Sequence, residues 1–185
     1  TKTWSRLHEN QFLDGQGKMS GYFEGPTLGP DGNFHLIWVW RNTPNAATNH
    51  SLSYARSPDL VNWFDSSDKP LALPLTLSHT EVVDPVKPGE GMINGNVKLG
   101  FDGKNRPMIS YHKYDENGNT QMYLARREAS KWNIVKVSDW QDFRWEFGGG
   151  GSLGRFPIKP HNPSLMDDGN ISVLVRKNEQ VMRFD

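Results

Sequence analysis

The sequence predicts an all-β protein built as a β-propeller, in which similar antiparallel sheets repeat along the chain. Three observations predict this fold. Asp-Gly pairs recur at a nearly constant spacing, apolar segments of strand length flank each pair, and no segment keeps a helical period beyond a turn or two. Glycine (18 residues) and proline (12 residues) divide the chain into short segments throughout.

The Asp-Gly pairs begin at Asp31, Asp102 and Asp168, which are 71 and 66 residues apart. Around them the chain reads EGPTLGPDGNFHLIWVWR, GNVKLGFDGKNRPMISYHK and HNPSLMDDGNISVLVRK. Each stretch contains a short strand, a tight turn and an apolar strand, which is the pattern of a β-hairpin. We therefore expect the three turns to be structural and to lie on one face.

A third strand follows the first two hairpins, in HSLSYARSPDLVNW and TQMYLARREASKWNI. Trp63 and Trp132 lie 69 residues apart in these segments. The repeat units cover about 20–90, 91–157 and an incomplete 158–185. One such unit cannot bury both of its faces, so neighbouring units must stack on it. A β-sandwich or an open set of meanders is the alternative fold.

Composition limits the classes of partner. Lys+Arg and Asp+Glu both number 21, so the chain lacks the basic excess of a nucleic-acid-binding protein. No run of 18 apolar residues occurs, so we expect no contact with a membrane through a spanning helix. The chain has no cysteine, which excludes disulfides and thiolate metal sites. No signal peptide is visible, which says little about the compartment.

Polar residues fall where the predicted strands reach the face opposite the turns. In a propeller blade the first strand starts at this upper face, the second returns to it and the third leaves from it. First strands are expected to begin near Glu24, Gly95 and His161. The polar residues expected together at the upper face are Arg41, Asn49, His50, Asn96, Tyr111, His112, Tyr114 and Asn162.

Four of these residues also have a structural interpretation. His50 follows a long polar loop and fits an exposed loop histidine, and His112 fits a side chain hydrogen-bonded between sheets. Tyr111 and Tyr114 fit packing residues whose hydroxyl groups reach the rim. Strand alternation separates Tyr111 from His112, so the two side chains point to opposite sides.

Three segments together resemble a known group of proteins: RNTPNAATNHSLSYARSPDLVNW, INGNVKLGFDGKNRPMISYHKYDENGNTQMYLARRE and WEFGGGGS. They resemble the BNR-repeat-like propeller proteins that include ulvan lyases and rhamnose–glucuronate lyases. The resemblance covers roughly residues 20–180. It implies a seven-bladed propeller, of which this chain would supply about two and a half to three blades of one catalytic domain over residues 1–185. The remaining blades would then lie outside this chain.

The resemblance also implies a reaction. Such lyases cleave a uronate-containing polysaccharide by β-elimination, in which an Arg neutralises the uronate carboxylate and His or Tyr groups move the protons. It implies His50 and Tyr111 as the acid/base pair, without deciding which is the base, and Arg126 as the neutralising group. His112 is the alternate to the first pair and Arg127 to Arg126. The expected substrate-binding residues are Arg41, Asn49, Asn96, Tyr114 and Arg127.

The implied partner is an anionic polysaccharide, with ulvan favoured, and this substrate implies a secreted or periplasmic protein. β-Elimination requires no cofactor; a structural calcium or zinc ion is compatible with the group, but the sequence shows no ligand set for one. A five-bladed glycosidase is an alternative that needs carboxylates at first-strand starts, where only Glu24 is acidic. A non-catalytic carbohydrate-binding propeller is the other alternative.

Overall fold

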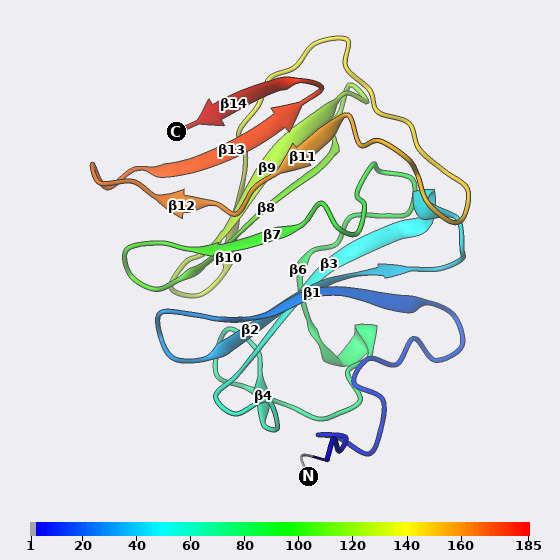
Figure 1. The fold of residues 1–185 in the computed structure, drawn as a ribbon, viewed down its shortest axis with the longest axis vertical. Coiled ribbons are helices and arrows are strands. Elements are labelled where there is room, and N and C mark those ends of the chain that lie inside the picture. Colours follow the sequence, from blue (N-terminus) through cyan, green and yellow to red (C-terminus); the bar gives the residue numbers. More distant parts are fainter. Residues whose placement is uncertain (1–2) are drawn as a thin grey trace.

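The computed structural model describes residues 3–185 as three antiparallel sheets. Figure 1 shows the sheets following one another from the N-terminal to the C-terminal end. The first sheet contains β1 Ser20–Leu28, β2 Phe34–Arg41, β3 Asn49–Ser57, β4 Trp63–Phe64, β5 Pro70–Leu71 and β6 Glu81–Asp84. The second contains β7 Lys98–Phe101, β8 Pro107–Tyr114, β9 Thr120–Arg127 and β10 Trp132–Lys136. The third contains β11 Ile158–Pro160, β12 Ser164–Leu165, β13 Ile171–Lys177 and β14 Gln180–Phe184.

Two short 3-10 helices, η1 Ala46–Thr48 and η2 Leu77–His79, lie in the loops of the first sheet. Within residues 3–185, no helix is both long and apolar enough to cross a membrane.

The strand β2 shows how the alternation of side chains builds two cores. Ile37 and Val39 point into the core between the first and second sheets, whereas Trp38 and Trp40 point into a core on the other side. All four side chains are fully buried. Because both faces of β2 are covered, its sequence is a continuous apolar run rather than an alternating one.

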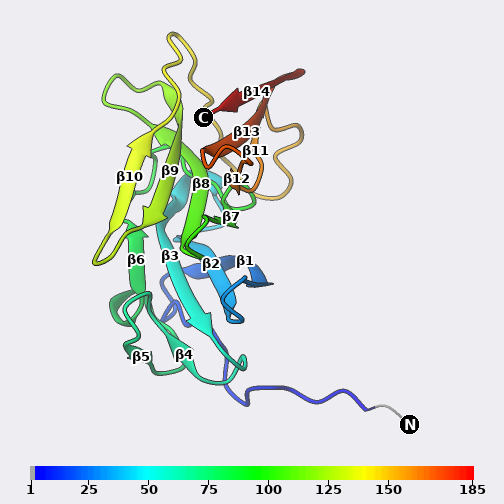
Figure 2. The same cartoon turned by 90° about the vertical axis from the view of Figure 1, so that its left-hand side faces the viewer.

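The second sheet lies between the other two. Ile109 and Tyr111 of β8 join the core with the first sheet, and Met108 joins a core with Val173 and Ile158 of the third sheet. Figure 2 shows the strand order β6, β3, β2, β1 across the first sheet and β10, β9, β8, β7 across the second. In both sheets the strands follow one another from left to right in this view, from the last strand of the sheet to its first. The sheets therefore stack face to face, as the repeat predicts.

The three Asp-Gly turns are structural, as predicted. In each turn the aspartate Oδ1 accepts a backbone hydrogen bond from the residue two positions on, at 2.9 to 3.1 Å. Gly32 and Gly169 have φ of 80° and 86°, whereas the positive φ of the second turn is at Asn105. All three turns lie on the left in Figure 1.

The predicted starts of the first strands are wrong in position. β1 begins at Ser20, four residues before Glu24, because its pairing continues past an irregularity between Glu24 and Thr27 to reach Arg41. β7 begins at Lys98, just after Asn96. In the third sheet, β11 begins three residues before His161 and is separated from β12.

The second and third strands reach or leave the upper face at the polar residues expected there. β2 ends at Arg41, β8 ends at Tyr114, and β9 begins at Thr120. The ends of the sheets opposite the Asp-Gly turns, called the upper edge below, therefore carry the predicted polar residues of β2, β3 and β8.

Candidate functional site

A cavity of about 330 Å³ opens at the upper edge of the first sheet. Lys18, Tyr22, Arg41 and Asn42 contribute its functional side chains. Lys18 precedes β1, Tyr22 lies in β1, and Arg41 ends β2, so the hairpin of these strands builds the wall. The early start of β1 brings Lys18 and Tyr22 beside Arg41.

Arg41 is held in place without an acidic partner. Its guanidinium carbon lies 4.6 Å from the centre of the Tyr22 ring, which is a cation–π contact. Its Nε donates to Thr43 O at 3.1 Å and its Nη2 donates to Pro44 O at 2.9 Å. Among residues 3–185, neither Arg41 nor Lys18 forms an ion pair, and the residues that line the cavity include no carboxylate. The cavity therefore holds two positive charges suited to an anionic ligand.

His50 borders this site through Asn42. His50 Nε2 lies 2.8 Å from Asn42 Oδ1, and its Nδ1 lies 2.9 Å from Ser51 Oγ. The side chain is 5% exposed, and this burial lowers the pKa of His50. The ring is therefore neutral at pH 7, so one of its nitrogens can accept a proton.

The pairing of β2 with β3 separates His50 from Arg41. His50 lies opposite Trp40, and Arg41 lies opposite Asn49. Neighbouring residues of a strand point to opposite faces, so His50 and Arg41 leave the sheet on different sides and approach only at its rim. Asn49 is fully buried, and its Nδ2 donates to Ala46 O at 2.6 Å, so it shapes the loop beside the cavity.

Tyr111 lies in the core between the first and second sheets rather than at the surface. It is fully buried, and its hydroxyl donates to Asp84 Oδ2 at 2.6 Å. Lys113 Nζ donates to the same oxygen at 2.7 Å. Burial and the Asp84 carboxylate raise the pKa of Tyr111 well above its usual value, so Tyr111 keeps its proton. Asp84, from β6, was not predicted from the sequence.

His112 points the other way, as alternation predicts, and is also buried. Asn96 Nδ2 donates to His112 Nε2 at 3.0 Å and to Ile158 O at 2.8 Å. This contact links the second sheet to the third. Burial lowers the pKa of His112 to about 4, so the ring is neutral at neutral pH. The structure therefore agrees with the structural interpretation of His112, and it places Asn96, expected to bind substrate, in the same sheet interface.

Tyr114 lines a second, smaller cavity of about 200 Å³ at the upper edge of the second sheet. The Arg144 guanidinium lies 3.8 Å from the centre of the Tyr114 ring. Arg144 Nε also donates to Glu146 Oε1 at 2.8 Å, so its charge is balanced within the site. This cavity contrasts with the first one, where the cations have no carboxylate partner.

Arg126 and Arg127 lie at the far end of β9, near the turns, where β9 pairs with the start of β8 and the start of β10. Arg126 pairs in register with Met108, near the start of β8, and forms an ion pair with Glu128 at 2.6 Å. Arg127 points to the other face and donates to Ser66 and Ser67 of the first sheet. The structure does not bring either arginine together with His50 or Tyr111.

The upper edge therefore brings together Arg41, Asn49 and His50, while Tyr111, His112 and Asn96 lie in the sheet interfaces. Lys18, Tyr22, Asn42 and Arg144 complete the two cavities, and sequence reasoning did not single them out. Lys18 and Tyr22 could have been found from the position where β1 begins. The sequence predicts this start near Glu24, four residues later than the observed start at Ser20. Among residues 3–185, no group of three or more His, Cys, Asp or Glu side chains could hold a metal ion.

Comparison with solved structures relates this fold to a polysaccharide lyase. A PL25 ulvan lyase bound to GlcA(1-4)Rha3S matches with a TM-score of 0.55 and 14% identity, over 90% of this chain and 43% of that chain. A second structure of a PL25 ulvan lyase matches with a TM-score of 0.56 and 13% identity, over 94% of this chain and 45% of that chain. The chain thus spans less than half the length of the ulvan lyases that it resembles, and it matches part of their β-propeller.

A comparison with curated protein sequences gave no match. The family comparison is positive: residues 1–140 match the model of the BNR repeat-containing family. This match covers most of the chain and agrees with the repeat, the stacked sheets and the ulvan lyase likeness. The chain belongs to the BNR repeat-containing family.

Proposed function

We propose that this chain is part of a polysaccharide lyase that cleaves rhamnose–uronate linkages by β-elimination, with ulvan as the favoured polymer. The observation that carries the proposal is the cavity in which Lys18 and Arg41 lack acidic partners, beside the neutral His50. A uronate polymer presents a carboxylate on each uronate ring, and arginine can bind a carboxylate with parallel hydrogen bonds. The likeness to an ulvan lyase bound to GlcA(1-4)Rha3S supports the same substrate class.

Arg41 is the group that we assign to the uronate carboxylate, in place of Arg126. The C5 proton of a uronate becomes easier to remove when a cation neutralises the adjacent carboxylate, because negative charge develops there in the transition state. The hydrogen bonds from Arg41 to Thr43 and Pro44 fix its guanidinium before substrate arrives. Lys18 adds a second positive charge at the same cavity.

His50 is the group that we assign to removal of the C5 proton. A general base must be neutral at the working pH, and the lowered pKa of His50 meets this requirement. Tyr111 is enclosed by the core and bonded to Asp84, so we assign it a structural role instead of a direct one. As the C4–C5 double bond forms and the C4–O4 bond breaks, the departing O4 takes its proton from the protonated His50 or from water.

We further propose that the parent propeller has seven blades. Three stacked sheets that align with 43% of an ulvan lyase chain support this number. A lyase for an extracellular polymer would be secreted or periplasmic.

The elimination itself gives the direct test. The protein is mixed with ulvan, and separately with gum arabic, and the ultraviolet absorbance of the new C4–C5 double bond is followed. An absorbance rise that disappears in His50→Ala supports the proposal, and the active polymer identifies the substrate. New reducing ends without absorbance would mean hydrolysis and would overturn it.

A non-catalytic carbohydrate-binding propeller is the second candidate. The burial of Tyr111 and His112, and the exposure of only 5% of His50, favour it, because this burial limits the contact of all three groups with a polymer. It predicts that ulvan binds to the Arg41 cavity without any absorbance rise. The glycosidase alternative has less support, since Glu24 is ion-paired with Lys98 of β7.

A further inference from the structure

The outermost position of the first sheet is interrupted by an extra segment. β4 and β6 both pair with β3, β4 opposite Arg56 and β6 opposite Leu52 to Tyr54, whereas β10 alone occupies this position in the second sheet. Residues 65–80, called the insertion below, separate β4 from β6 and contain β5 and η2. The repeat of the second sheet has no counterpart to it.

Backbone contacts fix the insertion to the segment that precedes β1. Leu75 is fully buried, its N donates to Phe12 O at 2.8 Å, and its O accepts from Asp14 N at 2.9 Å. The insertion is thus an ordered part of the fold.

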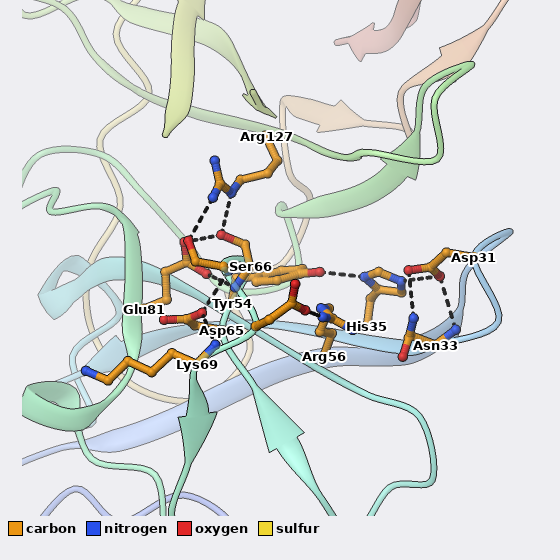
Figure 3. Close-up of polar contacts among 12 residues, drawn as sticks. Asp31, Asn33, His35, Tyr54, Arg56, Asp65, Ser66, Lys69, Glu81 and Arg127 are labelled. Carbon is orange, nitrogen blue, oxygen red and sulfur yellow. Dashed lines mark hydrogen bonds and ion pairs between the residues drawn. The ribbon is translucent and has the colours of Figure 1, made fainter. Parts of the chain in front are cut away.

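Side chains also fix the insertion to the second sheet. Glu81 accepts hydrogen bonds from Ser66 N at 2.7 Å and from Trp132 Nε1 at 2.8 Å. Arg127 donates to the hydroxyl groups of Ser66 and Ser67. Figure 3 shows Arg127 reaching down to Ser66 beside Glu81, with Asp65 and Lys69 close by. This network gives Arg127 a structural role and holds the polar wall of the insertion in place.

The insertion encloses a cavity of about 500 Å³, larger than the cavities at Arg41 and Tyr114. Its apolar wall is the continuous run Pro70, Leu71, Ala72, Leu73 and Pro74, of which Leu71 and Leu73 also pack against the core around Trp63. Its polar wall consists of Asp65, Lys69, Ser78, His79, Thr80 and Glu81. A pocket of this size with one apolar side and a few polar groups is typical of small-ligand sites.

The polar wall retains groups that can bind a ligand. Asp65 Oδ1 accepts from the backbone of Ser67 and Lys69, and its Oδ2 accepts no hydrogen bond within residues 3–185. His79 Nδ1 lies 3.0 Å from Thr76 Oγ1, and its exposed ring leaves Nε2 available. Polar groups that can donate or accept and hydrocarbon in one lining suit a sugar ring, whose edge carries hydroxyls and whose face carries C–H groups.

We propose that this cavity binds a deoxyhexose ring of a saccharide chain, as a second site that shares no lining residue with the Arg41 cavity. The five residues of the apolar wall offer no side-chain hydrogen-bond partner, so a methyl group fits against them better than a hydroxymethyl group, whose hydroxyl would be buried unpaired. That the natural ligand is a rhamnose-containing polysaccharide rests on the proposed function. Binding of the deoxyhexose ring itself does not depend on catalysis.

The test compares L-rhamnose with L-mannose, which differs from it only by the hydroxyl on C6. Backbone amide NMR shifts of the protein are followed as each sugar is added. L-Rhamnose should shift amides in residues 65–81, and L-mannose should bind about tenfold more weakly. Equal affinities for the two sugars, or shifts confined to the Arg41 cavity, would overturn the proposal.

Two variants locate the site and separate it from the lyase proposal. Asp65→Asn keeps an acceptor for the turn but changes Oδ2, and His79→Ala removes an exposed ring. Each should weaken rhamnose binding at least fivefold and leave elimination on a short oligosaccharide unchanged, whereas Arg41→Ala should leave rhamnose binding unchanged. If rhamnose binds to both variants as it does to the original protein, the second site is wrong, whatever the outcome of the elimination assay.

Discussion

The upper edges of the first and second sheets carry similar polar residues in different surroundings. At the first sheet, Arg41 and Lys18 face a cavity with no carboxylate. At the second sheet, Tyr111 and Lys113 are both bonded to Asp84 in a packed interface. The second sheet lies between two others, so its polar groups are paired inside the protein. The two upper edges thus differ: the first carries cations that lack acidic partners, and the second has its polar groups paired within the packing of the sheets.

The largest expected effect is on the buried carboxylate of Asp84, which links β6 of the first sheet to β8 of the second. Asp84→Asn removes the charge that Lys113 and Tyr111 share, and leaves the Lys113 ammonium without an anion in a largely buried place. We expect a loss of about 3 kcal/mol in the free energy of unfolding, measured by urea denaturation.

Lys113→Met provides the matched control. The double variant Asp84→Asn, Lys113→Met should recover much of the loss, because no charge then remains unpaired. Strictly additive losses in the two single variants would contradict the pairing of these two side chains.

A smaller effect is expected from the histidine between the second and third sheets. His112 has a pKa of about 4 in the folded chain and an ordinary value near 6.5 when unfolded. Between these values the unfolded chain binds more protons, so His112 stabilises the fold fully above about pH 6.5 and loses this contribution as pH falls toward 4. His112→Gln should therefore reduce the slope of stability against pH in this window. An unchanged slope would show that other groups produce it.

Tyr111→Phe tests the structural role of the tyrosine. Removing one buried hydroxyl while Lys113 still bonds Asp84 should cost about 1 kcal/mol of stability, and polymer binding should stay the same. The measurement is thermal or urea unfolding together with an ulvan titration. A stable variant that has lost elimination activity would instead support Tyr111 as an acid or base.

The smallest effect is expected from Arg126. Its ion pair with Glu128 is partly exposed, so Arg126→Ala should change the unfolding free energy by at most about 0.5 kcal/mol. Ulvan binding should not change, because Arg126 lies near the turns. A large loss of binding on this substitution would restore the role that the resemblance implies for it.

The periodic features were predictable from the sequence. The Asp-Gly spacing predicted the hairpins, and the alternation of Tyr111 and His112 predicted their opposite faces, because both depend on local geometry. The partners of these residues were not predictable. Asp84 meets Tyr111 only because β6 pairs with β3, after an insertion that the repeat gives no reason to expect.

The site was predictable only in part for the same reason. Arg41 and His50 follow from the strand ends, whereas Lys18 and Tyr22 depend on where β1 begins. That start is fixed by pairing with β2 beyond an irregularity, so it is a contact between strands rather than a local signal.

The most direct test of the contrast between the two edges is the affinity of a short ulvan oligosaccharide for three proteins: the original chain, Arg41→Ala and Arg126→Ala. Loss of a charge-assisted contact should make Arg41→Ala bind at least about tenfold more weakly, which corresponds to about 1.4 kcal/mol. Arg126→Ala should bind within about twofold of the original, the change expected for a charge remote from the ligand. Unchanged affinity in Arg41→Ala, or a loss found only in Arg126→Ala, would contradict the assignment of the first-sheet cavity as the anion-binding site.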